Sequence, residues 1–557
     1  MSAASAARSA QTDRFVHERL PAPADWPYLH YDLPPLRIAA QVNLVAELLD
    51  GALAKGWGER PMLRSPTRVL SYRQALERVQ AIGQVLTGDL RLEPGNRVLL
   101  RGGNSIDMAL AWLAVVRAGL VAVATMPLLR AAELSAVIAK AQPALALCDA
   151  RLLDDLQSAV AQTPLADGQA LRVIAFDAEN TQPPPPGSLN ARADERQGQA
   201  LAPCPVSADD IALMAFTSGT TGKPKAVIHR HREVLAACQA WPREFVRATP
   251  DDVVIGSPPL AFTFGLGGML LFPMAAGASV LYADGPYTPE RLARCIHDFG
   301  VTICYTAPTF YRQTAPHMKA LEAERGKPRL RLAVSAGEGL PPATRALWHE
   351  ATGLHLMDGI GATEMFHIFI SSDGGPVPPG ALGRVVPGYV ARVVGEDGQE
   401  LPRGQIGRLA VTGPTGCLYL DDERQRLYVK DGWNYPGDAF LQDEAGYFHY
   451  RSRTDDMIVT AGYNVGGPEV EDALLQHPAV AECGVVGESD EERGMIIAAY
   501  CVLRPGQVGD AAMVKALQDH VKARLAPYKY PRKVVFVAQL PRTETGKLQR
   551  FKLKASS

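Results

Sequence analysis

Met214-Ala-Phe-Thr-Ser-Gly-Thr-Thr-Gly-Lys-Pro-Lys-Ala226 gathers hydroxyls, glycines and lysines in one short loop that follows an apolar run. Glycine lets backbone N–H groups close around an anion because no Cβ stands in the way. Hydroxyls add hydrogen-bond donors, and lysines add positive charge. We therefore predict that this loop binds phosphates. The predicted phosphate-binding residues are Thr217, Ser218, Gly219, Thr220, Thr221, Gly222, Lys223 and Lys225.

The loop differs from a Walker A loop, whose glycine stands further from its Gly-Lys pair and whose last residues open a helix. Here two residues separate Gly219 from Gly222, and Pro224 follows the lysine. The flanking segments 211–216 and 226–229 are apolar and rich in residues that favour strands. We expect a strand, a loop and a second strand. A solvated turn rich in Ser, Thr and Gly is the alternative interpretation of this composition.

Length and charge narrow the class of protein. At 557 residues the chain is too long for one hydrophobic core, so several domains are expected. A formal net charge of −2 does not suit a nucleic-acid-binding protein or a polybasic membrane anchor. The apolar segments 108–125 and 265–282 are interrupted by Arg117, by glycines and by Pro273, which favours buried core over a membrane span.

Cysteine and histidine spacing gives no sign of a metal site. The eight cysteines are scattered without a Cys-x-x-Cys pair, and His229 and His231 lack further ligands at zinc spacing. This usage predicts reduced core thiols in a reducing compartment, and hence a cytoplasmic protein. The two histidines are interpreted as strand-end or surface residues. Residues 1–10 lack an apolar signal region and are expected to form a frayed tail.

The first part of the chain alternates between strand and helix patterns. Strands are expected at 97–101, 120–125 and 144–148, and helices at 37–55, 105–118 and 134–141, with a Ser-capped helix after Ser71. This alternation is typical of an α/β fold with a largely parallel sheet. Residues 178–210, which contain four successive prolines, are predicted to form a loop or connector.

The strand pattern resumes after the phosphate-type loop. Further strands are expected at 252–256, 301–305, 330–334 and 354–358, with an aromatic-rich turn at 257–265. Several of these strands end in small or polar residues, and ligands of open α/β sheets bind beyond the carboxyl ends of strands. From about residue 383 the strands become shorter, as at 407–413 and 447–450. A small C-terminal domain with helices at 468–476 and 513–525 is expected to begin near Asp455.

Several motifs in a fixed order give the chain a family resemblance. They are the phosphate-type loop, residues 359–364, Gly437-Asp438, residues 453–456 and Gly546-Lys547. With this set, the chain resembles the acyl-adenylate-forming superfamily over essentially its whole length. That superfamily includes acyl-CoA synthetases, adenylation domains of peptide synthetases and firefly luciferase. Residues 358–369, together with the N-terminal stretch 20–27 and residues 43–50, are similar to the benzoate- and 2-aminobenzoate-CoA ligase branch.

The resemblance implies both an architecture and a reaction. It implies a large N-terminal adenylation domain, residues 1–454, of two α/β subdomains plus a short-stranded β subdomain. Residues 455–557 would form a small mobile α+β domain that carries the catalytic lysine. In the family reaction, a carboxylate attacks the α-phosphorus of MgATP to give an acyl-adenylate and pyrophosphate. The thiol of coenzyme A then displaces AMP.

The resemblance also implies roles for individual residues. Lys547 would bridge the carboxylate and the phosphate with its mobile ammonium group, Thr363 would lie near the α-phosphate, and Glu364 would hold Mg²⁺, a cation that favours oxygen ligands. Asp455 would be the hinge, and Gly462 and Tyr463 would lie beside the pantetheine of CoA. The adenine and ribose would bind at Gly337, Glu338, Asp358, Gly359, Ile360, Asp438 and Arg453.

An acyl pocket follows from the same resemblance. Its residues would be Phe262, Thr263, Phe264, Gly265, Ala307, Gly361, His367 and Ile368. Aromatic and small residues together suit a flat ring better than a long chain, so a benzoate-type acid is expected, with 2-aminobenzoate first. His367 is expected to meet an ortho substituent or the carboxylate, and a satisfied core histidine is the alternative.

Two positions depart from the family pattern, and other functions stay open. Pro436 stands where threonine is usual, which stiffens the turn before Asp438, and Ser452 stands where glycine is common. The alternatives are an aryl-AMP loader of a carrier protein, a medium-chain acyl-CoA synthetase, a luciferase-type oxidoreductase and a non-catalytic nucleotide-binding protein. The sequence does not distinguish a monomer from a homodimer.

Overall fold

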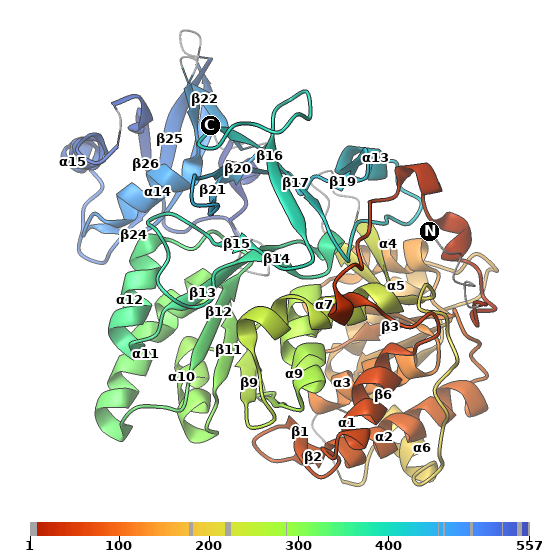
Figure 1. Ribbon diagram of the computed structural model, residues 1–557. Helices are drawn as coiled ribbons and strands as arrows, with labels where there is room; N and C mark the ends of the chain where they lie inside the picture. The colour runs from red at the N-terminus through yellow and green to blue at the C-terminus, as the bar shows by residue number, and fades with distance from the viewer. Residues whose placement is uncertain are drawn as a thin grey trace.

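The computed structural model describes residues 8–177, 182–217, 224–283, 285, 287–454, 456–460, 463–490, 494–525, 527–542 and 548–554. These residues build four β-sheets. In Figure 1, two sheets with their helices form the large lower body, and the C-terminal sheet, in blue, stands above it at the upper left. This arrangement confirms the predicted α/β fold with a smaller C-terminal domain. The boundary between residues 454 and 455 stays a prediction.

The first sheet carries the predicted phosphate loop. Its strands, in order across the sheet, are β6 (Val173–Phe176), β5 (Leu145–Asp149), β3 (Arg97–Arg101), β4 (Val121–Thr125), β7 (Ile211–Thr217) and β8 (Lys225–Arg230). The strands from β6 to β7 are parallel, whereas β8 returns antiparallel to β7. Thr217 pairs with Lys225 at the end of this hairpin. The two predicted strands that flank the loop are therefore confirmed.

The second sheet is parallel in its centre and antiparallel at both edges. Its order is β15 (Arg384–Val385), β14 (Ile368–Ser371), β13 (Leu356–Gly361), β12 (Leu332–Ala336), β11 (Ile303–Thr306), β9 (Val253–Gly256), β10 (Ser279–Leu281), β1 (Pro61–Arg64) and β2 (Val69–Ser71). The pairs from β13 to β1 are parallel. Because parallel strands end at the same edge, the carboxyl ends of β9, β11, β12 and β13 meet where a ligand site is expected.

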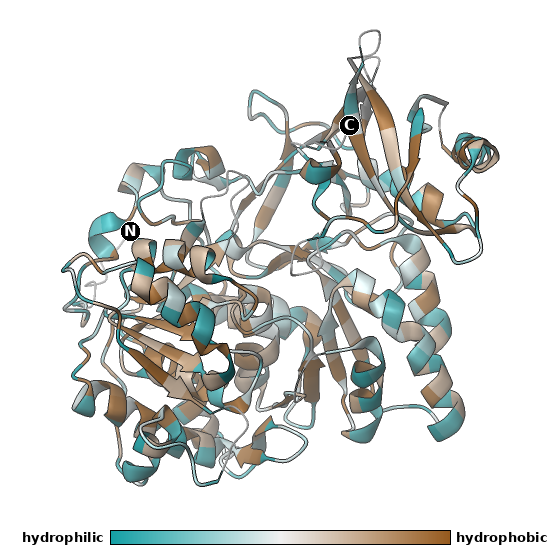
Figure 2. Cartoon of the chain, turned by 180° about the vertical axis from the view of Figure 1, so that it is seen from behind, coloured by the Kyte–Doolittle hydropathy of each residue, from teal (hydrophilic) through white to brown (hydrophobic). Residues whose placement is uncertain are grey.

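Helices cover these two sheets. They are α1 (Gly51–Ala54), α2 (Tyr72–Gln84), α3 (Ile106–Arg117), α4 (Ala131–Ala141), α5 (Leu153–Gln162), α6 (Leu189–Glu195), α7 (His231–Gln239), α8 (Thr263–Leu266), α9 (Phe272–Ala276), α10 (Pro289–Asp298), α11 (Pro308–Arg325) and α12 (Pro342–Thr352). Every residue of α3 is buried, as expected of a helix that is apolar on all sides. One continuous hydrophobic core joins both sheets through it. Figure 2 shows hydrophobic residues concentrated on the strands and hydrophilic residues on the outer helices.

The remaining two sheets lie at the C-terminal side. One is built from β18 (Val429–Lys430), β19 (Trp433–Asn434), β17 (Ile406–Thr412), β20 (Asp438–Gln442), β21 (Phe448–Arg453) and β16 (Val390–Val394). Helix α13 (Gln425–Tyr428) lies between β17 and β18 in the chain. The other is built from β23 (Tyr463–Val465), β22 (Ile458–Thr460), β25 (Gly494–Leu503), β24 (Val480–Asp490) and β26 (Lys533–Phe536), with α14 (Gly467–Leu475), α15 (Ala511–Lys522) and α16 (Arg550–Lys554). Helix α14 contacts both β21 and α12, so it joins the C-terminal sheet to the rest of the chain.

The helix predicted over residues 37–55 is shorter than expected. It occupies only the C-terminal part of that range, as a π-helical turn at Ala46–Asp50 followed by α1. The reason is Asn43, whose amide Nδ2 donates to the carbonyl oxygens of Val116 (3.3 Å) and Arg117 (3.0 Å). Its Oδ1 accepts from the backbone N–H of Val45 (3.1 Å), which caps the helix at this point.

Two predicted loops contain helix. The connector 178–210 includes α6, which begins where the Ser188 hydroxyl accepts from the N–H of Ala191 (3.2 Å). The aromatic turn at 257–265 becomes helical at Thr263 and continues through α8, a π-helical turn at Gly267–Leu271 and α9. That helix is almost wholly buried, so packing decides its conformation over the weak helix propensity of its glycines.

Among the described residues, no helix combines the length and apolar composition that a membrane crossing needs.

Candidate active site

Strand β8 presents one face to the turn that follows β13. Side chains alternate along a strand, so Lys225, Val227 and His229 share this face. Residues 418–420 pair with β8 as an additional extended segment, with Tyr419 opposite Val227. The N–H of Ile228 donates to the carbonyl of Leu418 (2.8 Å), and that of Leu420 to the carbonyl of Ala226 (2.9 Å). This pairing brings the Tyr419 side chain beside Lys225.

Lys225, Tyr419 and Glu364 form a chain of hydrogen bonds. The Lys225 ammonium donates to the Tyr419 hydroxyl oxygen (2.9 Å), and the Tyr419 hydroxyl donates to Oε1 of Glu364 (2.5 Å). Lys225 Nζ itself lies 3.8 Å from that carboxylate oxygen. Burial and the neighbouring Glu364 raise the pKa of Tyr419, so its hydroxyl keeps its proton. The structure thus brings together the predicted phosphate-binding lysine and the predicted magnesium ligand.

A histidine holds the neighbouring residue of the same turn. His229 is fully buried, and its Nε2 donates to the carbonyl oxygen of Thr363 (2.8 Å). Its Nδ1 lies 3.7 Å from Oε2 of Glu233. Burial acts to raise the pKa of Glu233, but Arg230 and His229 outweigh it and the pKa is lowered. His229 is therefore a buried strand residue that supports Thr363, rather than a surface residue.

The turn after β13 has an unusual backbone. Thr363–Met365 form a short 3-10 helix, and Phe366 follows with φ of 64°, a left-handed value that bulky residues seldom adopt. The turn reverses the chain from β13 into the antiparallel strand β14. A Cβ on Gly361 would lie 2.6 Å from the carbonyl oxygen of His367, so this close reversal requires glycine. Backbone strain at such a position is common at functional sites.

The phosphate loop itself is described only at its ends. Ser218, Gly219, Thr220, Thr221, Gly222 and Lys223 lie outside the described residues. Thr217 and Lys225 face each other at the base of the hairpin. The Thr217 hydroxyl is buried and has no hydrogen-bond partner among the described residues. Phosphate binding by this loop stays a prediction.

The predicted adenine segments lie side by side at the ends of two strands. In the register of β12 and β13, Ser335 pairs with Asp358, and Ala336 with Gly359, so Gly337 and Glu338 continue beside Ile360. Glu338 accepts a hydrogen bond from the Thr309 hydroxyl (2.7 Å).

Asp358 uses both carboxylate oxygens within the protein. It accepts from Arg345 Nη2 (2.7 Å) and from the N–H of Gly359 (3.0 Å). Burial raises the pKa of Asp358 to about 6, although Arg345 acts to lower it. Both oxygens of Asp358 are therefore engaged at the end of β13.

The predicted ribose residues face each other across β20 and β21. Asp438 pairs with Arg453 in the register, and Arg453 Nη1 donates to Oδ1 of Asp438 (3.3 Å) and to the carbonyl of Pro436 (2.7 Å). Gly437 has φ of 84°, and a Cβ there would lie 2.7 Å from Arg453 Nη2. At residue 436 the hydrogen bond to Arg453 involves the backbone carbonyl, and proline has a backbone carbonyl like any other residue. Ser452 is buried, with its hydroxyl 3.7 Å from the Met457 sulfur.

Aromatic rings surround His367 at the predicted acyl pocket. Its ring stacks on Trp241 (centroids 5.1 Å apart) and meets the edge of Phe272 (4.5 Å). Phe264, a predicted pocket residue, lies 5.4 Å away by ring centroids and contacts Tyr305 in turn. His367 Nε2 donates to the carbonyl oxygen of Phe264 (3.3 Å). The expected cluster of aromatic residues is therefore present.

Two polar atoms in this cluster are buried and lack partners in the part of the chain that the structure describes. Burial lowers the pKa of His367 to about 3, so its ring is neutral near pH 7. Because Nε2 carries the donated hydrogen, Nδ1 presents a lone pair. Neither His367 Nδ1 nor Trp241 Nε1 has a hydrogen-bond partner among the described residues.

The other predicted pocket residues lie on the elements around this cluster. Phe262 precedes α8, Thr263 and Gly265 belong to it, and Ala307 precedes α11 after β11. Ile368 begins β14 and is buried. The predicted site residues did not include Trp241, Tyr305 or Tyr419. None of the three belongs to a local motif; each reaches the site through contacts with residues distant in the sequence.

The predicted catalytic lysine and hinge are not tested. Lys547, Asp455 and Gly462 lie outside the described residues. Tyr463 begins β23 and pairs with Thr460. Their predicted roles stay predictions.

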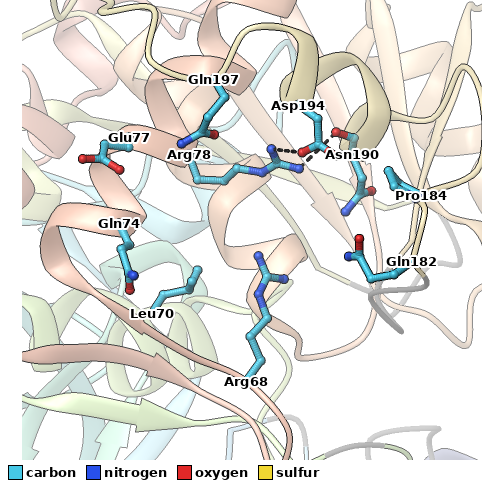
Figure 3. Close-up of a pocket in the computed structure, with 10 residues that line it drawn as sticks. All are labelled: Arg68, Leu70, Gln74, Glu77, Arg78, Gln182, Pro184, Asn190, Asp194 and Gln197. Atoms are coloured by element: carbon cyan, nitrogen blue, oxygen red, sulfur yellow. Dashed lines mark hydrogen bonds and ion pairs between the residues drawn. The ribbon is translucent and has the colours of Figure 1, made fainter.

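A cavity of about 350 Å³ lies elsewhere, beside α2 and α6 (Figure 3). Arg78 pairs with Asp194 there (2.6 Å), and Arg68 with the buried Asp107 (3.0 Å). The remaining lining residues are Leu70, Gln74, Glu77, Gln182, Pro184, Asn190 and Gln197. None of these residues belongs to the predicted site. Arg68, Arg78 and Asp194 are therefore engaged in ion pairs within the protein.

Comparisons with known proteins agree with this geometry. A family model described as AMP-binding enzyme matches residues 52–418, and one described as AMP-binding enzyme C-terminal domain matches residues 469–547. A benzoate–CoA ligase of Thauera aromatica is 33% identical over 95% of this chain and 98% of its own length. A 3-hydroxybenzoate–CoA ligase of Aromatoleum sp. (strain CIB) is 31% identical over 92% of this chain and 96% of its own.

One solved structure is similar over nearly the whole fold. The anthranilate CoA ligase AuaEII in complex with anthranoyl-AMP has a TM-score of 0.85 and 32% identity. The match covers 93% of this chain and 98% of that chain.

Proposed function

Because the chain belongs to the AMP-binding enzyme family, as an aryl acid–CoA ligase of the benzoate–CoA ligase type, we propose that its substrate acid is 2-aminobenzoate. As an acid–thiol ligase of this family it uses ATP, Mg²⁺ and CoA. The reaction forms an aryl-adenylate and pyrophosphate, and then an aryl-CoA thioester and AMP. The observation that carries the choice of acid is the buried, unpaired lone pair of His367 Nδ1.

A buried acceptor without a partner costs about 1–3 kcal/mol. His367 Nε2 is already engaged with the Phe264 carbonyl, so only Nδ1 is left to accept. The amino group of 2-aminobenzoate has hydrogens to donate to it, whereas unsubstituted benzoate has none. The flat rings of Trp241 and Phe264 beside His367 suit an aromatic acid. The solved anthranilate ligase supports the same choice of substrate.

The residues predicted to bind ATP, here called the nucleotide side of the site, would stabilise the charge that develops during the reaction. Lys225 and the loop before it would neutralise the phosphates, and Asp438 would accept hydrogen bonds from the ribose hydroxyls. Lys547 would bridge the attacking carboxylate and the α-phosphate. These roles, like the division into residues 1–454 and a mobile domain 455–557 with its hinge at Asp455, are part of the proposal.

The residues present suit a magnesium ion. Glu364 offers a carboxylate, of which Oε1 accepts from Tyr419 and Oε2 is the oxygen left for a cation. The described residues contain no group of three or more His, Cys, Asp or Glu side chains that could hold a metal ion. Mg²⁺ is commonly bound by one or two carboxylates together with substrate phosphates, so one carboxylate is enough. When bound, the ion would neutralise charge on the phosphate oxygens.

Exchange of pyrophosphate into ATP tests the choice of acid. We expect 2-aminobenzoate to give the highest kcat/KM in a panel with benzoate, 2-methylbenzoate, the three hydroxybenzoates and hexanoate. The 2-methyl acid is the matched control, because it fills the ortho position without a donor. Higher activity with a hydroxybenzoate or with benzoate would contradict 2-aminobenzoate as the preferred substrate. The protein would still be an aryl acid ligase. Exchange with hexanoate alone would contradict the aryl class.

Two further measurements complete the proposal. Thioester formation with free CoA, followed by chromatography, separates a CoA ligase from a loader of a carrier protein.

No disulfide joins the eight cysteines, all of which lie in described parts of the chain, and such thiols suit a reducing compartment. The proposed location is therefore the cytoplasm. Fractionation of the native cells that found the protein outside this compartment would contradict it.

A further inference from the structure

The Lys225–Glu364 contact depends on a third side chain. The ammonium nitrogen and the carboxylate oxygen Oε1 lie 3.8 Å apart, which is too far for a direct hydrogen bond. Tyr419 fills this interval with bonds of 2.9 Å and 2.5 Å. An ammonium group only donates, a carboxylate only accepts, and a phenol does both. The direction of the chain from Lys225 through Tyr419 to Glu364 is therefore fixed.

We propose that Tyr419 is a positioning residue, which sets the orientation of the Glu364 carboxylate and the location of the Lys225 ammonium for the adenylation half-reaction. This inference rests on the proposed roles of Lys225 and Glu364. Neither of those roles requires a tyrosine, so the bridge is an additional feature of this chain.

The bridge restricts two flexible groups at once. Rotation of a glutamate carboxylate about its last torsion is broad and nearly two-fold, so a donor on one oxygen selects an orientation. Because Oε1 accepts the hydrogen bond from Tyr419, Oε2 is the carboxylate oxygen that is left to bind a cation. Lys225 also lies over the Tyr419 ring, with Nζ 4.9 Å from the centroid, so a mobile lysine is held at one place.

The tyrosine itself is firmly anchored. Its backbone N–H donates to Oε1 of Gln425 (2.9 Å), and Nε2 of Gln425 donates to the carbonyl of Cys417 (3.0 Å). The Tyr419 side chain is fully buried in a cluster with Val227 and Tyr428. Its hydroxyl is thus fixed by backbone pairing with β8 and by packing, as a positioning residue requires.

Tyr428 provides a matched control. It is a buried tyrosine whose ring lies 5.9 Å from that of Tyr419, in the same cluster. Its hydroxyl has no hydrogen-bond partner in the described part of the chain. Tyr428→Phe therefore removes a hydroxyl from the same surroundings without breaking the bridge.

The test compares Tyr419→Phe with Tyr428→Phe in the full-length enzyme. Loss of a group that orients a metal ligand typically weakens metal affinity or activity by about 10- to 100-fold. We expect Tyr419→Phe to lower kcat of ATP–pyrophosphate exchange and to weaken Mn²⁺ binding to the enzyme–ATP complex, measured by electron paramagnetic resonance, by about this factor. The KM for the aryl acid and thioester formation from supplied aryl-adenylate should not change. Tyr428→Phe should leave all four quantities unchanged.

A double variant separates positioning from general damage. If Tyr419 acts through Glu364, Tyr419→Phe should add little to the loss that Glu364→Gln causes, because coupled residues are not additive. Thermal melting of each variant checks that the fold is retained. Mn²⁺ affinity and exchange within twofold of the wild type in folded Tyr419→Phe would overturn the proposal, as would equal losses in Tyr428→Phe.

Failure of the proposed function would look different. In that case the wild-type enzyme itself would fail to exchange pyrophosphate with aryl acids, or Glu364→Gln would exchange normally. Neither result requires a Tyr419 variant.

Discussion

The nucleotide side and the acyl side of this site satisfy their buried polar groups in different ways. On the nucleotide side, Lys225, Tyr419 and Glu364 bind one another, and His229 binds the Thr363 carbonyl. On the acyl side, aromatic rings enclose two polar atoms, on His367 and Trp241, that lack partners among the described residues. Lys225, Tyr419 and Glu364 are thus held by one another before any ligand arrives, whereas His367 Nδ1 and Trp241 Nε1 have no such partner in the described part of the chain.

This difference separates catalysis from selection. Groups that stabilise developing charge act best when they are already oriented, because no reorganisation is then needed during the reaction. Groups that select a substrate work by leaving a polar atom unpaired when the wrong molecule binds. Changes on the nucleotide side should therefore affect all acids equally, and changes on the acyl side should affect some acids more than others.

The largest expected effect is on the nucleotide side. Glu364→Gln should lower ATP–pyrophosphate exchange by about 10²- to 10³-fold, as removal of one electrostatic stabiliser commonly does. The factor should be the same for 2-aminobenzoate and benzoate, which steady-state kinetics with both acids measures. If Glu364→Gln lowered exchange with only one of the two acids, the nucleotide side would also select the substrate, and the proposed distinction between catalysis and selection would be wrong.

The pH dependence of stability tests the environment of Asp358, which lies on β13. The pKa of the buried Asp358 is about 6 in the folded protein, above its ordinary value of 3.8. The folded state therefore holds this proton more tightly, and the associated stability is fully present below pH 3.8 and is lost as the pH rises to about 6. The loss is about 3 kcal/mol for this shift.

Asp358→Asn keeps the hydrogen-bonding shape and removes the titration. We expect the difference in unfolding free energy between the wild type and Asp358→Asn to change between pH 4 and pH 6, with the wild type losing stability relative to the variant. Urea denaturation at several pH values measures this. Parallel pH profiles for the two proteins would be inconsistent with a buried, titrating Asp358.

A smaller effect is expected on the acyl side. His367→Phe keeps an aromatic ring but removes the Nδ1 acceptor. It should lower kcat/KM for 2-aminobenzoate by about tenfold relative to benzoate, since a lost buried hydrogen bond contributes about 1–2 kcal/mol. The ratio of the two kcat/KM values is the measurement, and benzoate is the internal control. An equal loss for both acids would assign His367 a packing role only.

The smallest effect is expected at Trp241. An amine offers its hydrogens to an acceptor, so the indole N–H of Trp241 gains little from 2-aminobenzoate. Trp241→Phe, which keeps ring stacking on His367, should change kcat/KM for this acid by less than about threefold, or 0.7 kcal/mol. A larger loss with a hydroxybenzoate than with 2-aminobenzoate would sharpen the comparison, because a hydroxyl oxygen can accept from the indole.

Local patterns predicted much of the fold. The Ser71 cap of α2, the strands β3 and β5 and the β7–β8 hairpin agree with expectation, because short-range hydrogen bonds and side-chain periodicity decide them. The start of the helix in residues 37–55 could not be predicted in this way. Asn43 ends the extended segment through carbonyl groups 73 and 74 residues away in the sequence.

By itself, the sequence determined the family, the order of the motifs and the side chains available for the chemistry. Lys225 could be named from the composition of its loop, and Glu364 from the family resemblance of the motif around it. Only the tertiary structure decided which of them touch, and through what. Tyr419 lies 194 residues from Lys225 and 55 from Glu364, yet one hydroxyl joins them. Such contacts follow from strand pairing and burial across the whole core, which no local pattern records.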